Sequence, residues 1–162
     1  EEGELRPQLQ DRFGLSVDVR TPTDVSTRVE IIRLREAYDH DSAAFRKKWA
    51  RKESALRKKI ETARSALDAV NTPAELLETA ARLCLALGTD GLRGELTLVR
   101  SARALAALEG ANSASLDHLR AIAPSVLRHR LRRDPLDESS ADIRVERVIT
   151  ELFDGATENG RD

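Results

Sequence analysis

The chain has 162 residues, of which 40% are apolar and 34% are charged, and its formal net charge is −1. This composition is typical of a helix-rich protein with many solvated faces, and the near-neutral charge excludes a global field that would draw the chain to nucleic acid or to a membrane. The single cysteine cannot form an internal disulfide and no apolar run approaches the roughly 20 residues that cross a bilayer, so we expect a protein of the reducing cytoplasm with no membrane insertion.

The first residues predict a short helix followed by a strand. Leu5 and Leu9 share one face of a helix that would end at Asp11 and Arg12. Residues 13–20 then alternate apolar and polar side chains, which predicts a strand. Because one strand is not stable alone, we expect its sheet partners outside this sequence or in another chain. The chain contains no Met and starts abruptly, and we interpret it as a segment of a longer protein.

Residues 23–71 predict helices. Thr23 is placed to cap the first, and a second helical stretch follows, with a break expected near Lys52 and Glu53. The polar face of this second stretch is basic, with Arg46, Lys47, Lys48, Arg51, Lys52, Arg57, Lys58 and Lys59. Such a face could bind nucleic acid, but no aromatic residues interleave for base stacking, so we interpret it as a solvated face.

Residues 72–153 predict a compact bundle of helices. Thr72 and Glu75 have the spacing of a capping box, and Gly88 is expected to end that helix. A nearly all-apolar helix over about 92–108 is expected in the middle of the bundle. The remaining boundaries are marked by cap residues and a proline, namely Ser113 or Ser115, Pro124 and Ser139.

No motif for covalent or metal chemistry stands out. The sequence has no GxxxxGK[ST] loop to hold a nucleotide triphosphate, and its histidines are scattered without metal-ligand spacing: His40, His118 and His129. Cys84 lies on an apolar helix face and is interpreted as a core residue.

Two arginines suit phosphate binding. Arg12, at the corner between helix and strand, would project a planar and permanently charged fork from a stiff base. Arg93 lies in the first turn of the 92–108 helix, where exposed amides favour anions. Taken singly, either could be an ordinary surface ion pair. A cluster of arginines near the end of the bundle could serve a ring contact or an acidic partner, or complement a helix end: Arg128, Arg130, Arg132 and Arg133.

Three extended motifs carry a family resemblance. They are EEGELRPQL with DRFG at 1–9 and 11–14, DGLRGELTL at 90–98 running on into 100–106, and HRLRRDPLD at 129–137. In this order they resemble the arginine-finger segment, the sensor 2 helix and the closing helical motif of the magnesium-chelatase I-subunit family of AAA+ ATPases. Gln10 departs from the family, which usually has Leu there, and would slightly loosen the finger helix.

The resemblance implies a mostly α chain in four parts. These are the end of a AAA+ αβ core with the arginine-finger helix and one strand (1–22), a helical linker region (23–71), a helical-bundle lid with sensor 2 (72–153) and a polar tail (154–162). It also implies that Arg12 is the catalytic finger, that Arg93 binds nucleotide, and that Asp11 and Arg6 lie at the subunit junction. Whether Arg93 acts on its own subunit's ATP or on a neighbour's stays open.

The resemblance further implies a biochemical setting. ATP with Mg²⁺ would be bound mainly by an upstream core, so the fragment alone should be inactive. The full protein would hydrolyse ATP in a hexameric homo-oligomeric ring and, with D and H subunits, drive Mg²⁺ insertion into protoporphyrin IX for chlorophyll or bacteriochlorophyll. It would lie in the cytoplasm, or in the plastid stroma of a plant or alga.

Three alternatives are open. A non-catalytic D-subunit scaffold is disfavoured by the two arginines and by a polar tail in place of an acidic, proline-rich linker. A cobalt-chelatase subunit fits as well, because the metal is not chosen on this subunit. Salt-sensitive DNA binding would favour a nucleic-acid motor of the AAA+ class.

Overall fold

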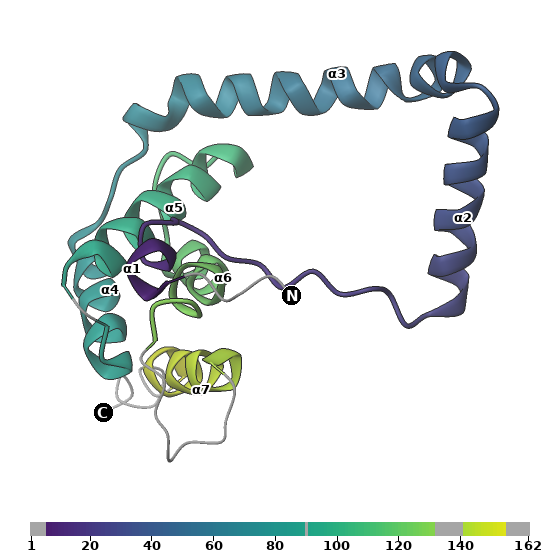
Figure 1. The fold of residues 1–162 in the computed structure, drawn as a ribbon. Helices are drawn as coiled ribbons and strands as arrows, with labels where there is room; N and C mark the ends of the chain where they lie inside the picture. The colour runs from purple at the N-terminus through teal and green to yellow at the C-terminus, as the bar shows by residue number, and fades with distance from the viewer. Residues whose placement is uncertain (1–5, 90, 132–140, 155–162) are drawn as a thin grey trace. The chain divides into compact units, whose positions relative to one another are not determined.

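The computed structural model describes residues 6–89, 91–131 and 141–154, and most of them are helical (Figure 1). The elements are α1 (Pro7–Gln10), α2 (Val25–His40), α3 (Ser42–Ala66), the 3-10 turn η1 (Leu67–Ala69), α4 (Ala74–Leu87), α5 (Arg93–Glu109), α6 (Leu116–Leu127) and α7 (Ala141–Asp154). The mostly α prediction is confirmed. The chain divides into two compact units, one of residues 18–62 and the other of the described residues before and after them.

The predicted strand over 13–20 does not form. No β-strand occurs within the described ranges, and Val17 and Val19 are 69% and 88% exposed. The one backbone hydrogen bond that this stretch makes to a distant segment runs from the Ser16 amide to the Ser125 carbonyl, at 2.7 Å. A strand needs a ladder of such bonds to a neighbour, and the described chain supplies none here.

The unit of residues 18–62 consists of α2 and most of α3, joined at Asp41. Asp24, not the predicted Thr23, caps α2, because its carboxylate accepts from the Thr27 amide at 2.8 Å and from two nearby hydroxyls. These hydrogen bonds lower the pKa of Asp24 from 3.8 to about 2. The rings of Tyr38 and Phe45 meet edge to face across the joint, with centroids 5.7 Å apart.

Helix α3 is continuous through Lys52 and Glu53, so the predicted break is wrong. Both residues are good helix formers, and neither a proline nor a glycine stands within the helix to stop it. A lapse in apolar periodicity therefore marked an exposed helix face rather than a helix end.

The second unit is built on a bundle of α4, α5, α6 and α7 with an aliphatic core (Figure 1). Helix α4 packs against the other three, α6 does the same, and α5 packs against α4, α6 and η1. Helix α5, predicted in the middle of the bundle, thus contacts α4 and α6 but does not contact the described part of α7. The fully buried larger side chains are Leu76, Leu83, Cys84, Leu98, Leu119, Val126, Leu127, Val145 and Ile149.

The helix ends of the bundle differ partly from expectation. Gly88 and Gly110 end α4 and α5 at φ values of 65° and 79°, the left-handed region that favours glycine. The capping box predicted at Thr72 is wrong, because Pro73 is the N-cap of α4 and no side chain caps it. Ser115 does cap α6, in a capping box completed by His118 Nδ1, which accepts from the Ser115 amide at 2.9 Å.

Pro124 does not interrupt α6, which runs on to Leu127. The predicted cap at Ser139 and the polar tail from residue 155 lie outside the described residues. Among the helices that the structure describes, none has the length and apolar character needed to span a membrane.

The core predicts a sharp contrast between two leucines on α4. Leu83 is 0% exposed and Leu85 is 78% exposed. We expect Leu83→Ala to lower the free energy of unfolding by about 2–5 kcal/mol, because it removes packed methyl groups and leaves a cavity. Leu85→Ala should change it by less than about 0.5 kcal/mol. Urea unfolding of both variants checks this, and similar losses in the two would contradict the packing described.

Candidate functional site

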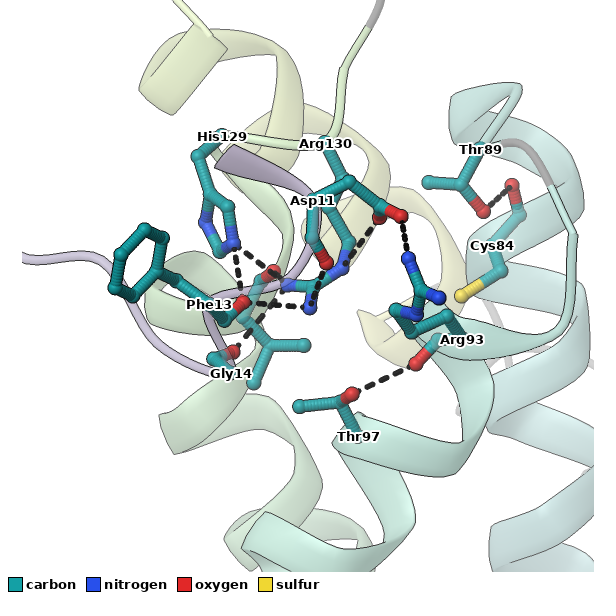
Figure 2. Close-up of polar contacts among 10 residues, drawn as sticks. Asp11, Phe13, Gly14, Cys84, Thr89, Arg93, Thr97, His129 and Arg130 are labelled. Carbon is teal, nitrogen blue, oxygen red and sulfur yellow. Dashed lines mark hydrogen bonds and ion pairs between the residues drawn. The ribbon is translucent and has the colours of Figure 1, made fainter. Parts of the chain in front are cut away.

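The residues that follow α1 lie against the bundle, beside the start of α5 and the end of α6 (Figure 2). Gly14 comes close to α5, since a Cβ added there would lie 3.8 Å from Thr97 Cγ2. The Ser16 amide donates to Ser125 in α6. The segment from Asp11 to Ser16 is therefore attached to the same unit as α4 to α7.

Asp11 brings two arginines together. Its carboxylate forms an ion pair with the guanidinium of Arg93, and Arg130 Nε lies 3.5 Å from its other oxygen (Figure 2). The side chains of Asp11 and Arg93 are 38% and 55% exposed, so water reaches this pair and its net contribution to stability is small. One carboxylate thus faces two guanidinium groups, and Glu95 adds a second carboxylate in the first turn of α5.

Arg130 is the buried member of the group, with its side chain 3% exposed. Nη2 donates to the carbonyls of Phe13 at 2.8 Å and Asp11 at 3.4 Å, and Nη1 donates to that of Gly14 at 3.3 Å and also to that of Val126. Burial lowers the pKa of Arg130 and the Asp11 charge opposes this shift, but an arginine stays protonated in any case. Arg130 thus holds the backbone on both sides of Arg12.

His129 adds a further contact to the same backbone. Its Nε2 lies 2.9 Å from the Phe13 carbonyl, which can only accept, and 2.8 Å from Arg130 Nη1, which can only donate. Burial lowers the pKa of His129 from 6.5, and the neighbouring charge of Arg130 lowers it further. Its Nδ1 is buried and has no hydrogen-bond partner among the residues that the structure describes.

Arg93 is the first residue of α5, and close packing fixes this helix end. Its neighbour Gly94 is buried, and a Cβ there would lie only 3.2 Å from the sulfur of Cys84. Burial raises the pKa of Cys84 to about 11, so its thiol is a neutral core group, as predicted. The first amides of any α-helix lack an intrahelical partner and carry a partial positive charge that attracts anions, and the N-cap residue Leu92 offers them no side-chain acceptor.

The structure brings Asp11 and Arg93 together but leaves the other two predicted site residues apart from them. Arg12 and Arg6 are exposed, and within the described ranges neither side chain forms a hydrogen bond or an ion pair. Arg12 therefore projects from a backbone that its neighbours hold.

Sequence reasoning missed the roles of Arg130 and His129, although both stand in the closing motif at 129–137. Arg130 faces inward rather than toward a ring contact or an acidic partner, and Arg128 Nε donates to the Pro124 carbonyl at 3.1 Å, which complements the end of α6. Arg132 and Arg133 lie outside the described residues.

Comparison with known proteins bears on both segments of this site. The AAA lid domain family matches residues 77–152, which include Arg93 and Arg130 but not Asp11 or Arg12. A magnesium-chelatase 38 kDa subunit from Acidiphilium rubrum is 59% identical over 156 residues, covering 96% of this chain and 45% of the relative. The chain is homologous to the carboxy-terminal part of magnesium-chelatase I subunits.

Further relatives agree with this assignment. The magnesium-chelatase 38 kDa subunit of Cereibacter sphaeroides is 59% identical over 153 residues, covering 94% of this chain and 46% of the relative. The chloroplastic magnesium-chelatase subunit ChlI of Oryza sativa subsp. indica is 40% identical over 153 residues, covering 94% of this chain and 37% of the relative. The chain thus spans less than half the length of the magnesium-chelatase subunits that it matches.

Acidification should destabilise the fold at His129, because burial and the neighbouring charge of Arg130 both disfavour the protonated ring. Because the pKa of His129 is lowered in the folded chain, its contribution to stability is fully present above about pH 6.5 and is lost as the pH falls through the folded pKa. We expect the urea midpoint to drop more between about pH 7.5 and about pH 5.5 in the wild type than in His129→Gln, whose amide can donate but does not titrate. An equal drop in both proteins would show that protonation of His129 does not cause the loss of stability.

Proposed function

We propose that the chain is the carboxy-terminal part of the ATP-hydrolysing AAA+ motor subunit of magnesium chelatase, which drives Mg²⁺ insertion into protoporphyrin IX in chlorophyll or bacteriochlorophyll biosynthesis. The observation that carries the proposal is the identity of 59% to magnesium-chelatase subunits over nearly the whole chain. We prefer it to a D-subunit scaffold or a cobalt chelatase because these relatives are named as magnesium-chelatase 38 kDa and ChlI subunits.

In this proposal the chain has four parts, assigned as the end of the nucleotide-binding core (1–22), the linker (23–71), the lid with sensor 2 (72–153) and a tail (154–162). ATP with Mg²⁺ is held mainly by a core that this chain does not cover, so the chain alone should not bind or hydrolyse ATP. The subunit forms a hexameric ring and works with D and H subunits, without nucleic acid, in the cytoplasm or in the plastid stroma.

Arg93 is the proposed sensor 2 residue, and its surroundings fit a phosphate group. It offers a half-exposed guanidinium beside the uncapped amides of α5. A bound phosphate would have to take over the contact that Arg93 makes with Asp11. This exchange is feasible because an exposed ion pair is weak and a triphosphate carries more charge than a carboxylate.

Arg12 is the proposed arginine finger, with Asp11 and Arg6 near the subunit junction. Its side chain is exposed, and among the described residues it forms no hydrogen bond or ion pair that a neighbour's phosphate would have to break. A planar, permanently charged fork on a held backbone suits the stabilisation of charge that develops on a transferring phosphoryl group.

For Arg12 we expect a large loss of hydrolysis with little loss of nucleotide binding. Arg12→Ala in the intact subunit should reduce kcat by roughly 10³–10⁵, the range seen for such fingers in other phosphoryl-transfer systems. Rings should still form, because an exposed side chain adds little to folding. ATPase assays, nucleotide titration and sizing of the assembly measure the three effects.

Mixing separates action across the junction from action within one subunit. Arg12→Ala subunits are combined with subunits that lack the phosphate-binding lysine of the core. Each variant alone should be inactive, and a mixed ring should recover hydrolysis at junctions that pair an intact loop with an intact arginine. Unaltered hydrolysis by Arg12→Ala alone would remove the finger assignment.

For Arg93 the shape of the cation should matter as well as its charge. Arg93→Ala should impair hydrolysis by removing a charge-assisted contact to phosphate. Arg93→Lys should recover only part of the rate, because an ammonium cannot reproduce the two-pronged geometry of a guanidinium. Steady-state kinetics on both variants check this, and full activity in the lysine variant would indicate that Arg93 is only structural.

A further inference from the structure

We infer that Arg130 is a positioning residue for Arg12, and that it fixes the Arg12 backbone to the same helical bundle that carries Arg93. The two exposed arginines then move as one body. The catalytic part of this inference rests on the proposed role of Arg12, whereas the attachment itself does not.

The contacts of Arg130 bracket Arg12 in the sequence. Its guanidinium donates to the carbonyl of Asp11 on one side and to those of Phe13 and Gly14 on the other. A guanidinium is planar and presents its donors in a rigid fork, so several acceptors on one short segment fix that segment's orientation. The side chain of Arg12 takes no part in these contacts and stays exposed.

The helical bundle holds Arg130 rigidly. Arg130 is the third residue after the end of α6, its side chain is 3% exposed, and Nη1 also donates to the carbonyl of Val126 in the last turn of that helix. Val126 and Leu127 are fully buried in the bundle core. Moving the Arg130 guanidinium would therefore disturb core packing, whereas moving the exposed tip of Arg12 would not.

Asp11 extends the connection to Arg93. Its carboxylate contacts the guanidinium groups of Arg93 and Arg130, and its carbonyl accepts from Arg130. A ligand that draws Arg93 away thus changes the partner of the residue that directly precedes Arg12. The structure offers a short physical path from the start of α5 to Arg12, through one side chain and one peptide unit.

The test compares Arg130→Gln with Arg128→Gln in the intact subunit. Arg128 is the matched control, because it stands at the same helix end and its Nε donates to Pro124 within its own helix. We expect Arg130→Gln to accelerate hydrogen exchange at the Phe13 and Ser16 amides and to lower kcat by about 10–100-fold, with nucleotide affinity nearly unchanged, because a misplaced catalytic group costs rate rather than binding. Arg128→Gln should leave both readouts near the wild-type values.

A double variant separates positioning from a general loss of structure. If Arg130 acts through Arg12, adding Arg130→Gln to Arg12→Ala should lower kcat no further, because the group to be positioned is already gone. If Arg130→Gln does not fold, Arg130→Lys is tested in its place. It keeps the charge but lacks the fork, and we expect faster exchange and reduced kcat in a protein that melts near the wild-type temperature.

Three outcomes would overturn the inference. Unchanged exchange at Phe13 and Ser16 in a folded Arg130 variant would show that Arg130 does not hold this segment. Faster exchange with normal kcat, or a full additive loss on top of Arg12→Ala, would show that it does not act through Arg12. Normal hydrolysis by Arg12→Ala alone would instead remove the finger assignment, and the exchange measurement would still report on the attachment.

Discussion

A buried guanidinium is costly unless acceptors surround its donors, and this condition governs how the first part of the chain is placed. Arg130 meets it through its two Nη atoms, which donate to the carbonyls of Asp11, Phe13 and Gly14, of which Phe13 lies 117 residues away in the sequence. Its buried Nε forms no hydrogen bond with the described residues but lies 3.5 Å from the Asp11 carboxylate. The segment of residues 11–16 forms no strand, and its further contacts with the bundle include those of Asp11 with Arg93, Phe13 with His129 and Ser16 with Ser125. The dependence is mutual, because the arginine needs these acceptors and the segment needs the donors.

The charges around Asp11 explain how Arg93 can be held in one orientation and still be free to bind an anion. The carboxylate pairs with Arg93, while Arg93 itself stays 55% exposed. Burial keeps His129 neutral by lowering its pKa, so no third positive charge competes for Asp11 at neutral pH. An exposed pair of this kind contributes little to stability, and an incoming anion can replace it at small cost. Orientation without strong binding is a suitable resting state for a residue proposed to sense a phosphate.

Close packing beneath this group holds the start of α5 in place. Gly94 lets α5 approach Cys84 and the end of α4, and a side chain there would meet the sulfur at 3.2 Å. The aliphatic core supplies the same rigidity under Arg130, through the buried Val126 and Leu127. The polar groups at the start of α5 and near the end of α6 thus stand on well-packed helix ends. Their positions depend on core packing more than on their own contacts.

Aliphatic periodicity predicted the helices of the bundle. Gly88 correctly marked the end of α4, and Ser115, one of two candidate caps, marked the start of α6, because each of these signals acts within one helical turn. The same local reasoning failed at Thr72, because Pro73 is the N-cap of α4. It also failed over residues 13–20, because the described chain offers no partner for a strand there. It could place Arg12 at a corner and Arg93 at a helix start. It could not find the role of Arg130, whose acceptors come from the far end of the chain and meet it only when α4 to α7 pack together. Contacts over such separations carry no local sequence signal, so folding of the bundle alone brings Asp11, Arg93 and Arg130 into one network.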